Sequence, residues 1–111
     1  MIDIEAHIKN VCDQIVGGFS PHKIILFGSY ARGTENEDSD IDLLVIMPYE
    51  GNELEKMAEV RKTLDSALPL DVLVKTPIQI AKRLEMEDFF VREILESGKI
   101  LYDAGDLGVG K

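Results

Sequence analysis

Cysteine and basic side chains are scarce in this chain of 111 residues, and long apolar runs are missing. The one cysteine, Cys12, has no partner for an internal disulfide, and its place on the apolar side of an expected helix predicts a buried thiol. Twelve Lys and Arg stand against 21 Asp and Glu, a net charge of −9. That balance argues against a protein that holds nucleic acid through its phosphates. No apolar run approaches the roughly 20 residues that span a bilayer, so no membrane contact is expected.

The length fits one compact domain, because single hydrophobic cores are commonly built at about 100 to 150 residues. We expect one domain over residues 1–104 and a flexible C-terminal tail over residues 105–111. The first five residues carry acids where a secretory signal carries bases, and no apolar h-region follows. These features predict a soluble, cytoplasmic protein.

Hydrophobic periodicity predicts helices that alternate with short strands. The expected helices cover residues 4–18, 29–33, 52–68, 78–84 and 87–97, and the expected strands cover residues 23–27, 41–47, 70–74 and 100–102. Phe89, Phe90 and Ile94 stand at helical spacing and are expected in the core rather than in a partner contact. This order predicts an α+β fold, with a small mixed sheet of three or four strands covered by helices.

Two carboxylates stand two residues apart where an apolar strand is expected to begin. Residues two apart in a strand point to the same face, so Asp40 and Asp42 present their side chains together while Ile41 points to the other face. Two close carboxylates repel each other, and a cation relieves that repulsion. Hard oxygen ligands select Mg²⁺ or Mn²⁺ rather than zinc. The pair therefore predicts a metal clamp.

A phosphate-binding turn is predicted just upstream of these acids. Gly28 lets the backbone turn tightly out of the preceding strand, and the amides at the start of the next helix favour anions. Ser29 adds a hydroxyl, and Arg32, three residues on, faces the same phosphate group. Gly33 then ends the helix. Together the two segments predict a site for a metal-bound polyphosphate.

A Gly-Ser pair followed shortly by Asp-x-Asp resembles the signature of the nucleotidyltransferase superfamily of the DNA polymerase beta type. More closely, the chain resembles the minimal nucleotidyltransferases, the short single-domain members, over nearly its whole length. The residues that match their pattern are Gly28, Ser29, Arg32, Gly33, Ser39, Asp40, Ile41, Asp42 and Leu43. In such enzymes a third acid stands on the neighbouring strand, and Asp71 occupies the matching position. The resemblance implies the nucleotidyltransferase fold.

The resemblance also implies a reaction: AMP passes from ATP to a hydroxyl acceptor, and pyrophosphate leaves. Two Mg²⁺ ions, or Mn²⁺ in their place, would stabilise the attacking and leaving oxygens. The residues expected to hold the metal and act in catalysis are Asp40, Asp42 and Asp71. The residues expected to bind the nucleotide are Gly28, Ser29, Arg32, Gly33 and Ser39.

Minimal nucleotidyltransferases resemble the antitoxin half of a two-protein pair whose other half is a helical HEPN ribonuclease toxin. In active pairs the antitoxin adds AMP to a tyrosine of the toxin, so the resemblance implies a HEPN-type partner that is also the acceptor. Two alternatives stay open. One is an antitoxin that neutralises its toxin by binding alone. The other is a small-molecule nucleotidyltransferase of the aminoglycoside-modifying kind, with an acceptor pocket built by dimerisation. Homo-oligomers and hetero-oligomers are both compatible with the sequence.

Overall fold

The computed structural model describes residues 3–105. Its elements are α1 (Ile4–Phe19), β1 (Lys23–Phe27), α2 (Ser29–Arg32), β2 (Ile41–Ile46), α3 (Glu53–Lys62), β3 (Leu70–Lys75), α4 (Pro77–Glu85), α5 (Phe89–Ser97) and β4 (Lys99–Asp103). Each expected helix and strand is present in the expected order. The tail expected at residues 105–111 lies outside the described residues, apart from its first residue.

The four strands form one mixed sheet in the order β3-β2-β1-β4. β1 is antiparallel to both β2 and β4, whereas β2 and β3 are parallel. Parallel neighbours cannot be joined by a tight turn, and α3 makes the crossover between them. The predicted α+β fold with a small mixed sheet is confirmed.

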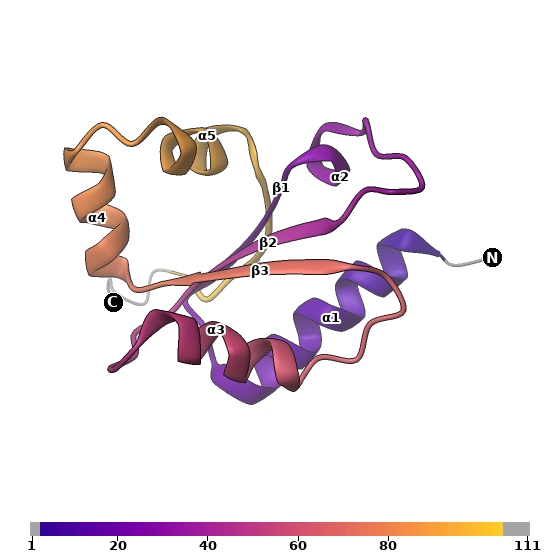
Figure 1. Cartoon of the computed structure of the whole chain (residues 1–111), viewed down its shortest axis with the longest axis horizontal. Coiled ribbons are helices and arrows are strands. Elements are labelled where there is room, and N and C mark those ends of the chain that lie inside the picture. Colours follow the sequence, from indigo (N-terminus) through magenta and orange to yellow (C-terminus); the bar gives the residue numbers. More distant parts are fainter. Residues whose placement is uncertain (1–2, 106–111) are drawn as a thin grey trace.

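Two pairs of helices enclose this sheet, as Figure 1 shows: α1 and α3 lie on one face, and α4 and α5 lie on the other. The first face packs Val11 and Ile15 of α1 and Val60 of α3 against the strands. The second packs Ile80 of α4 and Ile94 of α5 against them. Alternate residues of the strands serve the two cores, which explains why the central strand β2 is apolar almost throughout. The short helix α2 stands at one end of the sheet, after β1.

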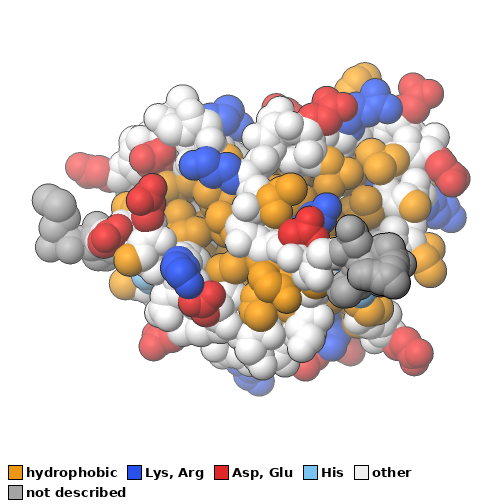
Figure 2. Space-filling model, turned by 180° about the vertical axis from the view of Figure 1, so that it is seen from behind, with side chains coloured by type: hydrophobic (Ala, Val, Ile, Leu, Met, Phe, Trp, Pro, Cys, Tyr) orange, Lys and Arg blue, Asp and Glu red, His pale blue; other side chains and the backbone are white. Residues whose placement is uncertain are grey.

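Charge is spread over the surface without a basic stripe on the face seen in Figure 2, where basic side chains stand singly among acidic ones. None of the helices within residues 3–105 is long and apolar enough to cross a membrane.

The expected helix over residues 52–68 is wrong at its end, because α3 stops at Lys62. The following residues bond to α1 instead of continuing the helix: Asp65 N donates to Gln14 Oε1 at 3.1 Å, and the Ser66 hydroxyl lies 2.8 Å from His7 Nε2. Near the start of the chain, α1 runs one residue beyond its expected end at residue 18, to Phe19.

The expectation that Phe89 and Phe90 belong to the core is also wrong. Phe89 is 77% exposed and Phe90 is 53% exposed, whereas Ile94 is buried at 3%. α5 begins at Phe89, so the helix turns Val91 and Ile94 toward the sheet and leaves the two rings at its start outside. Phe90 still contacts Phe27 edge to face, with ring centroids 5.7 Å apart.

Asp88 fixes the start of α5, because its Oδ1 accepts hydrogen bonds from Phe90 N at 2.9 Å and Val91 N at 3.2 Å. We expect Asp88→Ala to lower the free energy of unfolding by about 1 kcal/mol, the usual cost of losing an N-cap. Urea denaturation monitored by circular dichroism measures this. Asp88→Asn retains a capping oxygen and should stay close to the wild type, and equal losses in both variants would contradict a capping role.

Candidate active site

The acids on β2 and β3 lie side by side at one end of the sheet. The parallel register pairs Asp42 directly with Asp71, and the antiparallel register pairs Asp42 with Phe27 on its other side. Neighbouring strands are about 4.8 Å apart, so paired residues on one face come within reach of a shared ligand. Asp42 alternates with Leu44 and therefore faces the α4 and α5 side of the sheet. We expected Asp71 to stand on the strand next to Asp42, and the register of β2 and β3 places it there.

Gly28 brings the backbone against this acid. It has a φ of +76°, a conformation that side chains of L-residues rarely adopt, and it is the N-cap of α2. A Cβ at this position would collide with Oδ2 of Asp42. The residue is thus glycine for two separate reasons, its backbone conformation and its contact with the acid.

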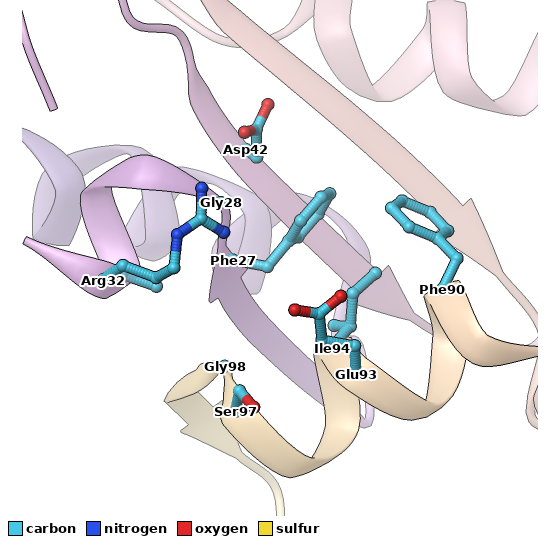
Figure 3. Close-up of a pocket in the computed structure, with 10 residues that line it drawn as sticks. Phe27, Gly28, Arg32, Asp42, Phe90, Glu93, Ile94, Ser97 and Gly98 are labelled. Atoms are coloured by element: carbon cyan, nitrogen blue, oxygen red, sulfur yellow. The ribbon is translucent and has the colours of Figure 1, made fainter. Parts of the chain in front are cut away.

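Backbone hydrogen bonds within the segment stabilise the short helix α2. The amides of Ala31 and Arg32 each donate to Gly28 O at 3.1 Å, and Thr34 N donates to Ser29 O at 3.0 Å. The helix places Ser29 next to Gly28 and carries Arg32 on an exposed side. Arg32 and Asp42 line the same cavity, so the guanidinium and the carboxylate flank one space, as Figure 3 shows.

The pKa of Asp42 reports how these groups act on one another. Partial burial raises the pKa of the Asp42 carboxyl, the negative charges of Asp71 and Asp40 raise it further, and Arg32 lowers it. Three carboxylates and one guanidinium therefore share a local electrostatic field. A carboxylate in such a field is stabilised by a bound cation, because the cation offsets the repulsion from its neighbours.

Two of the residues expected to bind nucleotide stand apart from this group. Ser39 orders the loop before Asp40, because its Oγ accepts from Asn36 N at 2.9 Å and its own amide donates to Asn36 O at 3.1 Å. Gly33, with a φ of +77°, ends α2 and lines a separate hollow between α1 and β4 rather than the cavity that holds Arg32. Contacts of these two residues with a nucleotide stay predictions.

A cavity of about 230 Å³ lies between α2, the ends of β1 and β2, and α5. The sequence reasoning missed one wall of it, which α5 supplies. That wall comprises Phe90, Glu93, Ile94, Ser97 and Gly98. The helical spacing of these residues places them on one face of α5, but nothing local to the sequence indicates that this face meets α2.

The donor set suits Mg²⁺, although it does not enclose an ion by itself. Within residues 3–105, no three His, Cys, Asp or Glu side chains converge as a ready-made metal cage. Mg²⁺ in phosphate-transfer sites is commonly held by one or two carboxylates while water and substrate phosphate complete its shell. The open pair of Asp42 and Asp71, with Asp40 close by, fits that kind of site.

Comparison with known proteins places this geometry in context. A family model described as the nucleotidyltransferase domain matches residues 5–101. The chain is 35% identical over 92 residues to the protein adenylyltransferase MntA of Thermococcus cleftensis, covering 79% of this chain and 88% of the relative. It is 34% identical over 80 residues to a Methanocaldococcus jannaschii protein, covering 72% and 77%.

Two solved structures share the fold. A Sulfolobus solfataricus protein described as a nucleotidyltransferase superposes with a TM-score of 0.61 at 20% identity, covering 91% of this chain and 86% of its own. A toxin–antitoxin complex with AMP-PNP contains a chain that superposes with a TM-score of 0.54 at 23% identity, covering 87% and 74%. The nucleotidyltransferase fold expected from the sequence is confirmed.

Proposed function

The chain belongs to the nucleotidyltransferase domain family, and from this premise we propose that it transfers AMP from ATP to a hydroxyl group of a partner protein. The observation that carries the proposal is the parallel register that sets Asp71 beside Asp42, opposite Arg32 on α2. Asp42 and Arg32 line one cavity, and Asp71 stands beside Asp42 on the neighbouring strand. The relative in Thermococcus cleftensis, named a protein adenylyltransferase, supports a protein as the acceptor.

In this proposal Asp40, Asp42 and Asp71 hold Mg²⁺, with Mn²⁺ as a substitute. When bound, the metal would offset the charge of the phosphates and of the acids themselves. The raised pKa of Asp42 supports this assignment, because burial and the charges of Asp71 and Asp40 disfavour the ionised carboxylate until a cation compensates.

The chain's own residues perform the remaining tasks. Ser29 and Arg32 bind the β- and γ-phosphates and so hold the triphosphate while negative charge accumulates on the departing pyrophosphate. Asp71 stands on β3, an edge strand of the sheet, where an acceptor hydroxyl approaches from outside. It orients that hydroxyl and receives its proton. The acceptor oxygen forms a bond to the α-phosphorus as the bond from that phosphorus to the β-phosphate oxygen breaks.

The acceptor we propose is a tyrosine of a HEPN-type toxin, with this chain as the antitoxin. The toxin–antitoxin complex among the structural neighbours supports a toxin partner, and the AMP-PNP in it supports an adenine nucleotide as donor. A cytoplasmic location belongs to the same proposal, since the single thiol stays reduced there.

The test is the transfer of label from α-³²P ATP to the co-encoded partner in the presence of Mg²⁺. Wild-type protein should label the partner, and the double variant Asp40→Asn/Asp42→Asn should reduce the rate by about 1,000-fold, since it removes two carboxylates proposed to hold the metal that offsets the negative charge of the transition state. Asp65→Asn, an exposed acid beside α1, is the matched control and should leave the rate unchanged. Adding EDTA should stop labelling in every sample.

The outcomes separate the alternatives. Toxin neutralised equally well by wild type and double variant, with no label on it, would favour an antitoxin that acts by binding alone. Label on an aminoglycoside with no partner present would favour a small-molecule nucleotidyltransferase. Label on the partner that persists in the double variant would overturn the assignment of the acids.

A further inference from the structure

The wall that α5 contributes to the cavity has a chemistry of its own. Phe90, Glu93, Ile94 and Ser97 recur at the spacings of one helix face and line the cavity together. Figure 3 shows Glu93 on this wall pointing into the space opposite Arg32. The transfer chemistry described above assigns no task to Glu93 or to Ser97.

Glu93 and Arg32 are not tied to each other. Among residues 3–105, the side-chain ion pairs within 4.0 Å involve neither of them, and both side chains are exposed. The Arg32 guanidinium is therefore available to a phosphate group. The Glu93 carboxylate is available to a donor on the same ligand.

The charge of Glu93 decides which part of a nucleotide it meets. An ionised carboxylate only accepts hydrogen bonds and repels phosphate, so its partner is a neutral or positive donor. The neighbouring hydroxyls of a ribose are such donors, and acids in dinucleotide-binding folds accept from the 2′-hydroxyl in this way. Ser97, one turn further along α5, offers a hydroxyl on the same side.

The size of the cavity and its apolar part agree with a sugar site. Its volume of about 230 Å³ is below the roughly 300–1,000 Å³ of complete small-molecule sites, so it suits part of a nucleotide. Phe27 and Phe90 meet edge to face at 85° and, with Ile94, give the cavity an apolar side. A sugar ring has an apolar face as well as hydroxyls, and the cavity offers contacts for both.

We propose that Glu93 accepts hydrogen bonds from the sugar hydroxyls of the bound nucleotide and thereby makes the site selective for ribonucleotides over 2′-deoxyribonucleotides. The inference rests on the proposed function, because it takes Arg32 and Ser29 as the phosphate contacts. Ser97 supports the same sugar from the next turn of α5. Selectivity for the donor thus comes from α5, while the Gly-Ser and Asp-x-Asp segments supply the phosphate and metal contacts.

The experiment measures binding and does not depend on turnover. Isothermal titration calorimetry with Mg²⁺ compares a non-hydrolysable α,β-methylene ATP analogue with its 2′-deoxy form. A hydrogen bond to a charged group contributes about 1.5–3 kcal/mol, so the wild type should prefer the ribonucleotide by about 10- to 100-fold. Glu93→Ala should bind the two analogues within about threefold of each other. Glu93→Gln, whose amide oxygen still accepts, should keep part of the preference.

Glu96→Ala is the matched control, an exposed acid on the same helix that does not line the cavity. It should keep the wild-type preference, and unchanged circular dichroism should show that all variants fold. Equal weakening of both analogues by Glu93→Ala would overturn the inference, because Glu93 would then contribute to binding without distinguishing the 2′-hydroxyl. A wild type that binds both analogues equally well would overturn it too. If the wild type binds neither analogue, the proposed function fails together with the inference.

Discussion

Asp42→Asn should abolish nucleotide transfer and, in the metal-free protein at neutral pH, raise the resistance to unfolding. Transfer should fall by about 1,000-fold, as expected when a ligand is lost from the metal proposed to offset the negative charge of the transition state. Stability should rise because burial and the charges of Asp71 and Asp40 raise the pKa of the Asp42 carboxyl. The native fold therefore carries an ionised group that it disfavours.

The difference in stability between wild type and Asp42→Asn should depend on pH. A carboxyl whose pKa is raised in the folded state contributes most to stability below its ordinary value near 3.9, and that contribution is lost as pH rises through the folded pKa. The midpoints of urea denaturation of wild type and Asp42→Asn should nearly coincide at about pH 3.5. They should separate as pH rises, with the variant the more stable.

Mg²⁺ should reverse the order of stability, because a ligand that binds only the folded state stabilises it by mass action. Added Mg²⁺ and ATP should raise the denaturation midpoint of the wild type and leave Asp42→Asn nearly unchanged. Asp65→Asn should follow the wild type under all conditions. An Asp42→Asn protein that is less stable than the wild type at pH 7 in EDTA would contradict this account of the site.

Gly28→Ala should disable the site and destabilise the fold at once. The backbone at Gly28 has a φ of +76°, and a strained conformation of this kind costs about 1–3 kcal/mol in a residue with a side chain. The new methyl group would also collide with Oδ2 of Asp42 and push that carboxylate from its place. A displacement of about 1 Å at a reacting group lowers the rate by about 100-fold. Thermal denaturation and the labelling assay measure the two effects.

Gly51→Ala is a control that introduces backbone strain without a steric collision. Gly51 also has a positive φ, +97°, but nothing lies within 4 Å of a Cβ placed there. It should lower the unfolding temperature by about 4–8 °C for each kcal/mol of strain while transfer activity is kept. If both variants lose stability equally and both stay active, the contact between Gly28 and Asp42 has no role in the site.

The parts of the candidate site that lie within one strand or one turn can be predicted from the sequence, because the geometry of that strand or turn positions them. Alternation along a strand predicts one face for Asp40 and Asp42, although β2 begins at Ile41 and Asp40 stands just before it. A glycine before a short helix marks the turn that carries Ser29 and Arg32. The order of helices and strands follows in the same way, since hydrophobic periodicity is set within each segment.

The remaining parts depend on contacts between distant segments. α3 ends early because Asp65 and Ser66 bond to α1, which a periodic pattern in residues 52–68 does not reveal. The rings of Phe89 and Phe90 lie outside the core because the N-cap at Asp88 fixes where α5 begins and therefore which of its residues face the sheet. The α5 wall of the cavity escapes sequence reasoning for the same reason: packing across the sheet, and not any local pattern, brings Glu93 opposite Arg32.

The parallel pairing of β2 with β3 has a consequence for the folding chain, because it brings together two acids that are distant in the sequence. β1 and β2 are consecutive strands, so Gly28 meets Asp42 through a contact of short sequence separation. Asp71 pairs with Asp42 across the α3 crossover, a contact of longer sequence separation, and closing a longer loop costs more entropy. A nascent or partly degraded chain without a docked β3 would have the Gly-Ser turn but would lack the acid proposed to receive the acceptor's proton. On the proposed mechanism, only copies in which β3 has docked would transfer the nucleotide.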